Sequence, residues 1–276
     1  MESIMVDENG EPHEMVQVHE HGFVKLLDVM GDDEEVENAA RISYGEGTRK
    51  VSQTRNLIRY LMRHQHTSPF EMCEVKFHIK LPIFIMRQLV RHRTANLNEY
   101  SGRYSVMSDE FYLPQGDYLQ KQSTTNNQGR EEVSEQKGLL QFEFNRIYDG
   151  ANMAYQVLLE HDLARELARA VLPVANYTEC IWKIDLHNFF HFVKLRADSH
   201  AQREIRDYAN AMYELVKPRF PLCCEAFEDY IRDAVTFSKK ELTIIKNRCD
   251  IRGSDYEQIG QLSKRETTEF IKKLGD

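Results

Sequence analysis

The sequence predicts an α+β protein in which a mixed or antiparallel sheet is packed by helices, with a helical portion from about Leu139 onward. Three observations lead to this prediction. The chain has 276 residues, 41% of them hydrophobic, which is enough to bury a substantial core. Apolar and polar residues alternate from Val75 to Leu81, as in a half-buried strand. Apolar residues recur every three to four positions within Val51–His64 and Leu139–Leu159, as on the buried face of a helix.

The composition limits the classes of protein that we expect. No run approaches the roughly 18 to 20 consecutive apolar residues that span a bilayer, and the first residues, MESIMVDENGEPHEM, are acidic where a secretory signal would be basic and then apolar. The sequence therefore predicts a cytoplasmic protein without a membrane partner. Its five cysteines are odd in number and show no CxxC spacing, so we expect reduced thiols instead of a disulfide framework or a zinc knuckle.

The N-terminal part is expected to pass from a tail into regular structure. Residues 1–21 are polar and acidic without a sustained apolar period, which predicts a mobile tail. Phe23–Met30 is rich in strand formers and predicts a strand. Asp32 or Asp33 can then cap a helix through its side-chain oxygen. The Val51–His64 helix runs into HQHTSPFE, which is either a plain helix end or a ligand-binding loop.

The stretch Arg87–Tyr104, RQLVRHRTANLNEYSGRY, concentrates charged side chains. It holds four arginines and a single acid, Glu99, inside a chain whose formal net charge is -8. A basic island on an acidic protein favours a pocket for one anion over a nucleic-acid surface, because the remaining charge opposes long-range attraction to a polyanion. We therefore predict a phosphate-binding site here and no nucleic-acid partner.

This window begins with a helix predicted from Ile83 to about Arg93. Its apolar residues share one face, whereas Gln88 and Arg91 lie toward the other. Because these two residues are three positions apart, their side chains can hold one ligand together. A solvated basic face is the alternative.

A polar loop is predicted to follow, from Thr94 to Tyr104. The backbone N–H groups of Ser101 and Gly102 can approach an anion closely because glycine has no side chain, and Arg103 can add a bidentate contact. Neither a Walker loop nor a GxGxxG fingerprint occurs in the chain. A flavin or a nicotinamide would therefore bind outside a Rossmann domain.

The second half of the chain reads mainly as helices. A short strand is predicted at Val106–Leu113, and the polar run Lys121–Gln136 is either a disordered loop or a substrate lid. Further elements are predicted as helices at Leu139–Leu159, Leu163–Leu172 and Leu186–Leu195 and as a strand at Tyr177–Ile184. Ser199 with Gln202, and Ser263 with Glu266, fit capping boxes at the starts of later helices.

Two histidine pairs have spacings that invite a metal-site interpretation. His64-x-His66 has no third ligand at a convincing spacing. His187 and His191 lie at i and i+4, but they lack the adjacent glutamate that a zinc protease uses as its base. We therefore predict no metal site.

One motif resembles a known family. RHR followed after seven positions by Ser, from Arg91 to Ser101, is similar to the signature of the flavin-dependent thymidylate synthases. Further blocks resemble that family in its order: GFVKLLDVMG at Gly22, AARISY at Ala39, HQHTSPFEM at His64, RELARAVLP at Arg165 and LRADSHAQREIRDYA at Leu195. The resemblance implies a family domain over residues 22–234, followed by an appended helical extension over residues 235–276.

The resemblance also implies roles for single residues. Residues implied to bind dUMP are Gln88, Arg91, Glu99, Tyr100, Ser101, Gly102, Arg103, Arg169 and Arg196. Residues implied to bind FAD are Ser43, His66, Ser68, Arg91, His92, Arg93, Glu99, Asp185, His187 and His191. Arg196 is implied to be catalytic, since its fixed cationic fork suits an enolate-like charge developing on the uracil ring. Without the resemblance, Arg196 reads as one half of a helix-terminal ion pair.

The implied reaction is the reductive methylation of dUMP to dTMP, with methylenetetrahydrofolate as carbon donor and with FAD reduced by NADPH. No cysteine lies near the signature loop, and a serine without an adjacent base is a poor nucleophile, so Ser101 is expected to bind phosphate. The resemblance further implies a homotetramer with active sites shared between subunits.

Two alternative functions remain at this point. One is a non-catalytic nucleotide- or RNA-binding module in which Tyr100 and Tyr104 stack on bases. The acidic total charge and the absence of an RNP-type motif argue against it. The other is an NADPH-dependent flavin reductase that transfers no carbon.

Overall fold

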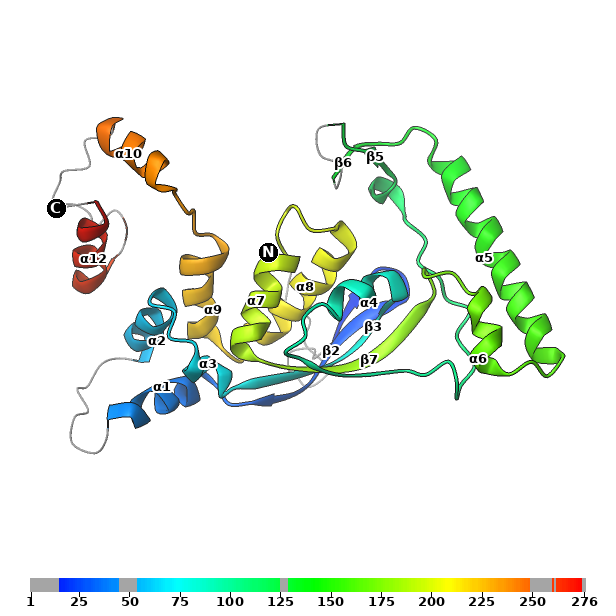
Figure 1. Cartoon of the computed structure of the whole chain (residues 1–276), viewed down its shortest axis with the longest axis horizontal. Coiled ribbons are helices and arrows are strands. Elements are labelled where there is room, and N and C mark those ends of the chain that lie inside the picture. Colours follow the sequence, from blue (N-terminus) through cyan, green and yellow to red (C-terminus); the bar gives the residue numbers. More distant parts are fainter. Residues whose placement is uncertain (1–14, 45–53, 125–128, 249–259, 261, 275–276) are drawn as a thin grey trace, which may run out of the picture. The chain divides into compact units, whose positions relative to one another are not determined.

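The computed structural model describes residues 15–44, 54–124, 129–248, 260 and 262–274 (Figure 1). The chain divides into two units, Met1–Arg232 and Asp233–Asp276. The first unit confirms the predicted α+β class, because it holds an antiparallel sheet packed by helices. Among the described helices, none combines the length and the apolar composition needed to cross a bilayer.

The sheet of the first unit has the strand order β1-β2-β3-β7-β4, and every neighbouring pair is antiparallel. Its strands are β1 Met15–Val18, β2 Gly22–Met30, β3 Glu74–Pro82, β4 Asn96–Glu99 and β7 Tyr177–Asp185. The central strand β3 alternates buried Val75 and Phe77 with half-buried Lys76 and His78. One face of the sheet is therefore apolar and the other polar, as the period-two pattern predicts.

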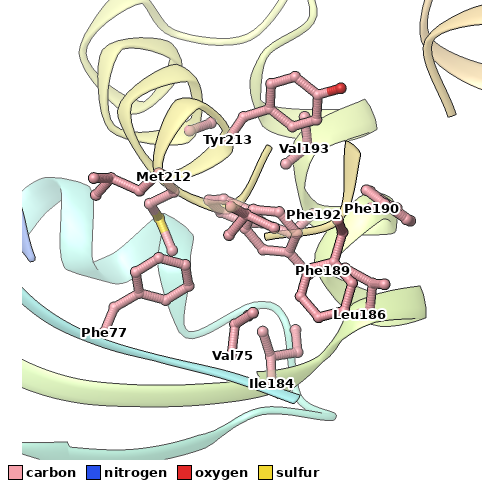
Figure 2. Close-up of a cluster of buried hydrophobic side chains, with 14 of the residues drawn as sticks. Val75, Phe77, Ile184, Leu186, Phe189, Phe190, Phe192, Val193, Met212 and Tyr213 are labelled. Carbon is pink, nitrogen blue, oxygen red and sulfur yellow. The ribbon is translucent and has the colours of Figure 1, made fainter. Parts of the chain in front are cut away.

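Helices α7 (Leu186–Arg196) and α8 (Arg203–Val216) cover the apolar face. Figure 2 shows Phe77 of β3 in one cluster with Phe189 and Phe192 of α7 and Met212 of α8. The rings of Phe77 and Phe189 stack with their centroids 5.9 Å apart, and the Phe192 ring lies 5.2 Å from that of Trp182 on β7. Aromatic side chains bury large apolar areas, so this layer fixes the position of α7 on the sheet.

The other elements of the first unit are helical apart from one small hairpin. Helix α1 (Asp33–Arg41) begins where predicted, since an Asp32 carboxylate oxygen accepts the backbone N–H groups of Glu34 and Glu35 at 2.8 and 3.0 Å. The remaining helices are α2 Thr54–Arg63, α3 Ser68–Glu71, α4 Ile83–Leu89, α5 Lys137–Glu160, α6 Arg165–Ala168 and α9 Pro221–Phe227. Short turns are η1 Ile42–Tyr44, η2 Gly116–Tyr118, η3 Arg169–Val171 and the π-helical η4 Glu228–Arg232, and the hairpin consists of β5 Gln120–Gln122 and β6 Arg130–Val133.

The second unit contains helices α10 (Lys239–Arg248) and α12 (Lys264–Leu274). The predicted capping box at the start of α12 is confirmed. The Ser263 backbone N–H donates to the Glu266 carboxylate at 2.8 Å, and the Glu266 backbone N–H donates to Ser263 Oγ at 3.4 Å.

Two strands lie where the sequence predicts a tail and a loop. Met15–Val18 pairs with β2 although it falls within the expected tail 1–21, of which residues 1–14 lie outside the described residues. Asn96–Glu99 pairs with β7 as the edge strand β4, although all four of its residues are exposed. The reason is that ladder hydrogen bonds satisfy the backbone whatever the side-chain pattern, and an edge strand needs no buried face.

Three further predictions are wrong in their extent or type. The helix that starts at Ile83 ends at Leu89, short of Arg93. Val106–Leu113 contributes a single bridge, between Phe111 and Asn176, instead of a strand. The polar run Lys121–Gln136 contains strand residues of the β5–β6 hairpin on both sides of residues 125–128, which lie outside the described part of the chain.

Candidate active site

A pair formed by His92 and Arg196 lies at the centre of the candidate site. His92 is in the turn after α4, and Arg196 is the last residue of α7. Arg196 Nε donates a hydrogen bond to His92 Nε2 at 3.0 Å. The His92 ring packs edge-on against Phe192 with centroids 5.0 Å apart, and it lies 6.3 Å from the ring of His191. The packing of α7 on the sheet therefore brings residues of two separate sequence blocks into contact.

This hydrogen bond requires a neutral His92. Burial, with the charges of Arg196 and His191, lowers the pKa of His92 to about 4. A protonated imidazole has donors on both ring nitrogens and cannot accept from Arg196, so the proton of the neutral ring is on Nδ1. Burial and the charge of Arg91 also lower the pKa of Arg196 from its ordinary value, which still leaves the guanidinium protonated at neutral pH.

The two arginines of this cluster are not neutralised. In the described part of the chain, neither Arg91 nor Arg196 forms an ion pair with a carboxylate. Arg91 is exposed and Arg196 is half-buried. Two uncompensated cations beside a neutral imidazole give a positive potential that favours an anionic ligand or a developing negative charge.

The loop around Gly102 forms a second basic cluster. A Cβ on Gly102 would lie 2.8 Å from Met107 Sδ and 3.1 Å from Arg169 Cδ, closer than ordinary side-chain contacts allow. Any larger residue at position 102 would therefore require the side chains of Met107 and Arg169 to move. The backbone N–H of Arg103 donates to Ser101 Oγ at 3.4 Å, which keeps the loop turned at Gly102.

Helix α6 and turn η3 hold this loop from the other side. Arg165 Nη1 donates to the carbonyl oxygen of Tyr104 at 3.1 Å, and Arg103 pairs with Glu166 at 3.3 Å. The hydroxyl of Tyr100 donates to the carbonyl oxygen of Val106 at 2.9 Å. These contacts hold the loop at both ends. The predicted anion-binding groups of the loop are joined by Arg169 of η3, which lies more than sixty residues later in the sequence.

Glu99 and Gln88 lie on different elements. Glu99 is in β4, where its Oε1 accepts from the Thr178 hydroxyl of β7 at 3.0 Å. Gln88 of α4 donates from Nε2 to Gln202 Oε1 at 2.6 Å, and Gln202 Nε2 donates to Glu204 Oε2 at 2.9 Å. The capping box predicted for Ser199 and Gln202 is therefore wrong, because α8 begins at Arg203 with Gln202 itself at the N-cap position, and Gln88 and Glu204 engage the Gln202 amide.

The sequence predicts no site role for Gln202, which it indicates only as a helix cap, and none for Glu204. Their only trace in the sequence is a polar residue at a helix start followed two positions later by an acid, which reads equally well as a solvated first turn. Their importance becomes visible only when α8 is placed beside α4.

Of the residues implied to bind a flavin, five lie on α7 or in and near η1 and α3. His187 and His191 stand one turn apart on α7, and Ser68 begins α3, which packs against α7. His66 is in the turn before α3, and Ser43 is in η1. In the described part of the chain, Ser43, His66 and Ser68 make no hydrogen bond to the His92–Arg196 pair or to the Gly102 loop.

Asp185 already has a local role. It caps α7, accepting from the Asn188 backbone N–H at 2.9 Å and from Asn188 Nδ2 at 2.8 Å. Both carboxylate oxygens are therefore engaged within the helix cap. Among the described residues, no three histidine, cysteine or carboxylate side chains are grouped so as to hold a metal ion.

Several of these side chains are exposed in the single chain. Arg91, Arg93, Glu99, His66 and Ser68 are all exposed. Within the described part of the chain, a ligand held by these residues would therefore have solvent on its open side.

Comparisons with known proteins identify the family of this chain. The family model described as "Thymidylate synthase complementing protein" matches residues 25–222. A "Flavin-dependent thymidylate synthase" of Dictyostelium discoideum is 49% identical over 264 residues, covering 92% of this chain and 87% of that protein. One of the same name from Ehrlichia ruminantium (strain Gardel) is 50% identical over 268 residues, covering 94% of this chain and 88% of that protein.

A solved structure is also similar. It is the crystal structure of a UMP/dUMP methylase, PolB, from Streptomyces cacaoi bound with 5-Br dUMP, with a TM-score of 0.72 and 33% sequence identity. The match covers 79% of this chain and 99% of that chain. The chain therefore belongs to the thymidylate synthase-complementing protein family, which is that of the flavin-dependent thymidylate synthases.

Proposed function

We propose that this protein converts dUMP to dTMP by reductive methylation, with methylenetetrahydrofolate as carbon donor and with FAD reduced by NADPH. The observation that carries the proposal is the cluster of Arg91, His92 and Arg196, in which Arg196 donates to a neutral imidazole and the charge of Arg91 acts on Arg196. Family membership supports the reaction class. The 5-Br dUMP in the crystal structure of the similar methylase supports a uracil nucleotide as substrate.

The two basic clusters support a division of labour on dUMP. The Gly102 loop offers backbone N–H groups and the cations Arg103 and Arg169, which suit a doubly charged phosphate. Arg196 suits the uracil ring, where its protonated guanidinium would stabilise the negative charge that develops when C5 acts as the nucleophile. Gln88, Arg91, Glu99 and Tyr100 complete the proposed set of nucleotide ligands.

The donor chemistry of the remaining residues fits a flavin nucleotide. A flavin diphosphate needs cations and N–H donors, which Arg91, Arg93 and the histidines of α7 supply, while half-buried His92 lies against the apolar ring of Phe192. Ser43, His66, Ser68 and Glu99 complete the proposed set, and Asp185 would act through its cap on α7. When bound, the flavin would supply the hydride that completes the methyl group.

The described cysteines support a reaction without a cysteine nucleophile. Burial raises the pKa of Cys73 to about 11 and those of Cys180 and Cys224 to about 12, and it raises the pKa of Cys223 well above its ordinary value. A thiol attacks as the thiolate, which these groups do not form near neutral pH. Cys249 lies outside the described residues. The four free thiols also suit the reducing cytosol, which is the location we propose.

We propose, in addition, a homotetramer whose sites are completed between subunits. Helix α5 exposes large apolar side chains, with Phe142 60% and Met153 68% accessible, and the implied ligands Arg91 and His66 are exposed as well. Apolar surface of this kind on a long helix is typical of a face that another protein surface covers. Light scattering on the purified protein measures the state, and a stable monomer that forms dTMP at full rate would refute this part.

The reaction is tested by following dTMP formation with dUMP, methylenetetrahydrofolate and NADPH. A protein that carries no flavin and forms no dTMP with all three substrates would refute the proposal. NADPH oxidation that is independent of dUMP, without dTMP, would identify a flavin reductase instead. Arg196→Met is expected to lower kcat/KM by about 100-fold or more, as loss of one charge-stabilising donor does, while Lys194→Met on the same helix retains full activity.

A further inference from the structure

Five side chains from four separate segments form one hydrogen-bonded chain that ends at Gln88. Arg130 Nη2 donates to both carboxylate oxygens of Glu204, at 2.8 and 2.7 Å. Tyr112 donates to the same carboxylate at 2.9 Å. Gln202 Nε2 donates to Glu204 Oε2 at 2.9 Å, and Gln88 Nε2 donates to Gln202 Oε1 at 2.6 Å. Glu204 is only 2% exposed, so its carboxylate is a buried anchor for the chain.

The charge state of Glu204 sets the direction of every bond in this chain. Burial acts to raise the pKa of Glu204, but the hydrogen bonds and charge of Arg130, with the hydrogen bond of Gln202, bring it below its ordinary value. An ionised carboxylate only accepts hydrogen bonds, so Gln202 must turn its NH2 group toward Glu204. The carbonyl oxygen of Gln202 then faces Gln88, so Gln88 must donate a hydrogen bond from its own NH2 group.

This order leaves Gln88 with a defined set of free groups. Its Nε2 has one N–H committed to Gln202, and in the described part of the chain its Oε1 makes no hydrogen bond. A glutamine amide turned the other way would offer a donor where this one offers an acceptor. The buried carboxylate thus determines which face of the Gln88 amide is available to a ligand.

We propose that Gln202 and Glu204 are positioning residues that orient the Gln88 amide toward the nucleotide, and that Arg130 of the β5–β6 hairpin anchors them. The inference rests on the proposed function, in which Gln88 is a dUMP ligand. It assigns residues at the start of α8, and Arg130 of the polar run Lys121–Gln136, to the support of a proposed nucleotide ligand.

The matched test uses Gln202→Leu, which keeps the side-chain size and removes both amide hydrogen bonds. Glu204 retains Arg130 and Tyr112 in this variant. We expect KM for dUMP to rise about tenfold, the effect of losing one oriented hydrogen bond, with kcat within about twofold of wild type. Flavin content and the midpoint of thermal unfolding are expected to stay unchanged.

Gln141→Leu is the control, because Gln141 is a half-buried glutamine of α5 that also makes two hydrogen bonds, to Pro114 O at 3.3 Å and to Gln115 Oε1 at 2.9 Å. Like Gln202→Leu, this variant loses two side-chain hydrogen bonds, but neither belongs to the series that ends at Gln88. The KM for dUMP should therefore not change. Glu204→Gln is the second variant, since a neutral amide at this position no longer dictates the direction of Gln202. It is expected to raise KM for dUMP as well.

The outcomes of these measurements separate a positioning role of Gln202 from a purely structural one. An unchanged KM in Gln202→Leu, beside a raised KM in Gln88→Leu, would overturn the positioning role. So would an unchanged KM in Gln88→Leu, or a loss of flavin and thermal stability in Gln202→Leu that matches its loss of dUMP affinity. If the wild-type protein itself neither binds dUMP nor forms dTMP, the proposed function fails first, and that outcome is distinct from the others.

Discussion

Removal of the Arg196 guanidinium should change the titration of His92. The pKa of His92 is held at about 4 by burial first, then by the charge of Arg196 and then by His191. Arg196→Met removes the second of these causes and the hydrogen bond from Nε, but it retains an apolar stem at the end of α7. We therefore expect the pKa of His92 to rise above 4 and to stay below the ordinary 6.5, because burial and His191 still act on the ring.

The same shift predicts how stability depends on pH. Between pH 6.5 and 4 an unfolded His92 binds a proton that the folded ring does not, so the free energy of unfolding is highest above pH 6.5 and falls toward pH 4. A pKa difference of about 2.5 corresponds to at most about 3.4 kcal/mol. Solvent screening at this partly buried ring reduces its contribution to about 1.5 kcal/mol. In Arg196→Met this part of the pH dependence should be smaller.

The assay is an NMR titration of the His92 ring protons between pH 3.5 and 8, combined with urea unfolding at pH 7 and pH 5. Lys194→Met is the matched control, because Lys194 lies on the same helix and is exposed. Its removal should leave the His92 titration at the wild-type value. A wild-type His92 that titrates near 6.5, or an Arg196→Met variant whose His92 titrates no higher than wild type, would refute the reasoning.

Two further predictions test the loop and the core. Gly102→Ala places a methyl group 2.8 Å from Met107 Sδ and 3.1 Å from Arg169 Cδ, so it should displace Arg169 and raise KM for dUMP about tenfold in steady-state assays, with little change in thermal stability. An unchanged KM for dUMP would show that nucleotide binding does not depend on the close contact between Arg169 and the loop at Gly102. Phe189→Ala removes the buried ring stacked on Phe77, so urea unfolding should show a loss of about 3 to 5 kcal/mol. A loss below about 1 kcal/mol would contradict the packing of α7 on the sheet.

Local sequence pattern predicts β3 and the start of α1, because the alternation within Val75–Leu81 matches the burial of that strand and the Asp32 side chain caps the helix. The three-to-four period within Leu139–Leu159 predicts the helix α5 but not its burial, since only Tyr148 and Tyr155 of this helix are buried. The charge pattern of Arg87–Tyr104 likewise indicates an anion site without any knowledge of the fold. The edge strand β4 is missed because its pairing with β7 depends on backbone hydrogen bonds, which leave no trace in side-chain period.

By itself, then, the sequence determined the alternation of β3, the helical period of α5, the excess of positive charge around the signature loop and the likeness to a family. Only the tertiary structure decided which of these groups meet. His92 and Arg196 are 104 residues apart, Gln88 and Gln202 are 114 apart, and both contacts join the α4 region to the end of α7 or the start of α8. The sequence pattern predicts that one face of an element is buried, but it does not predict which other element covers that face. The covering element is decided by the aromatic layer that packs α7 and α8 on the sheet.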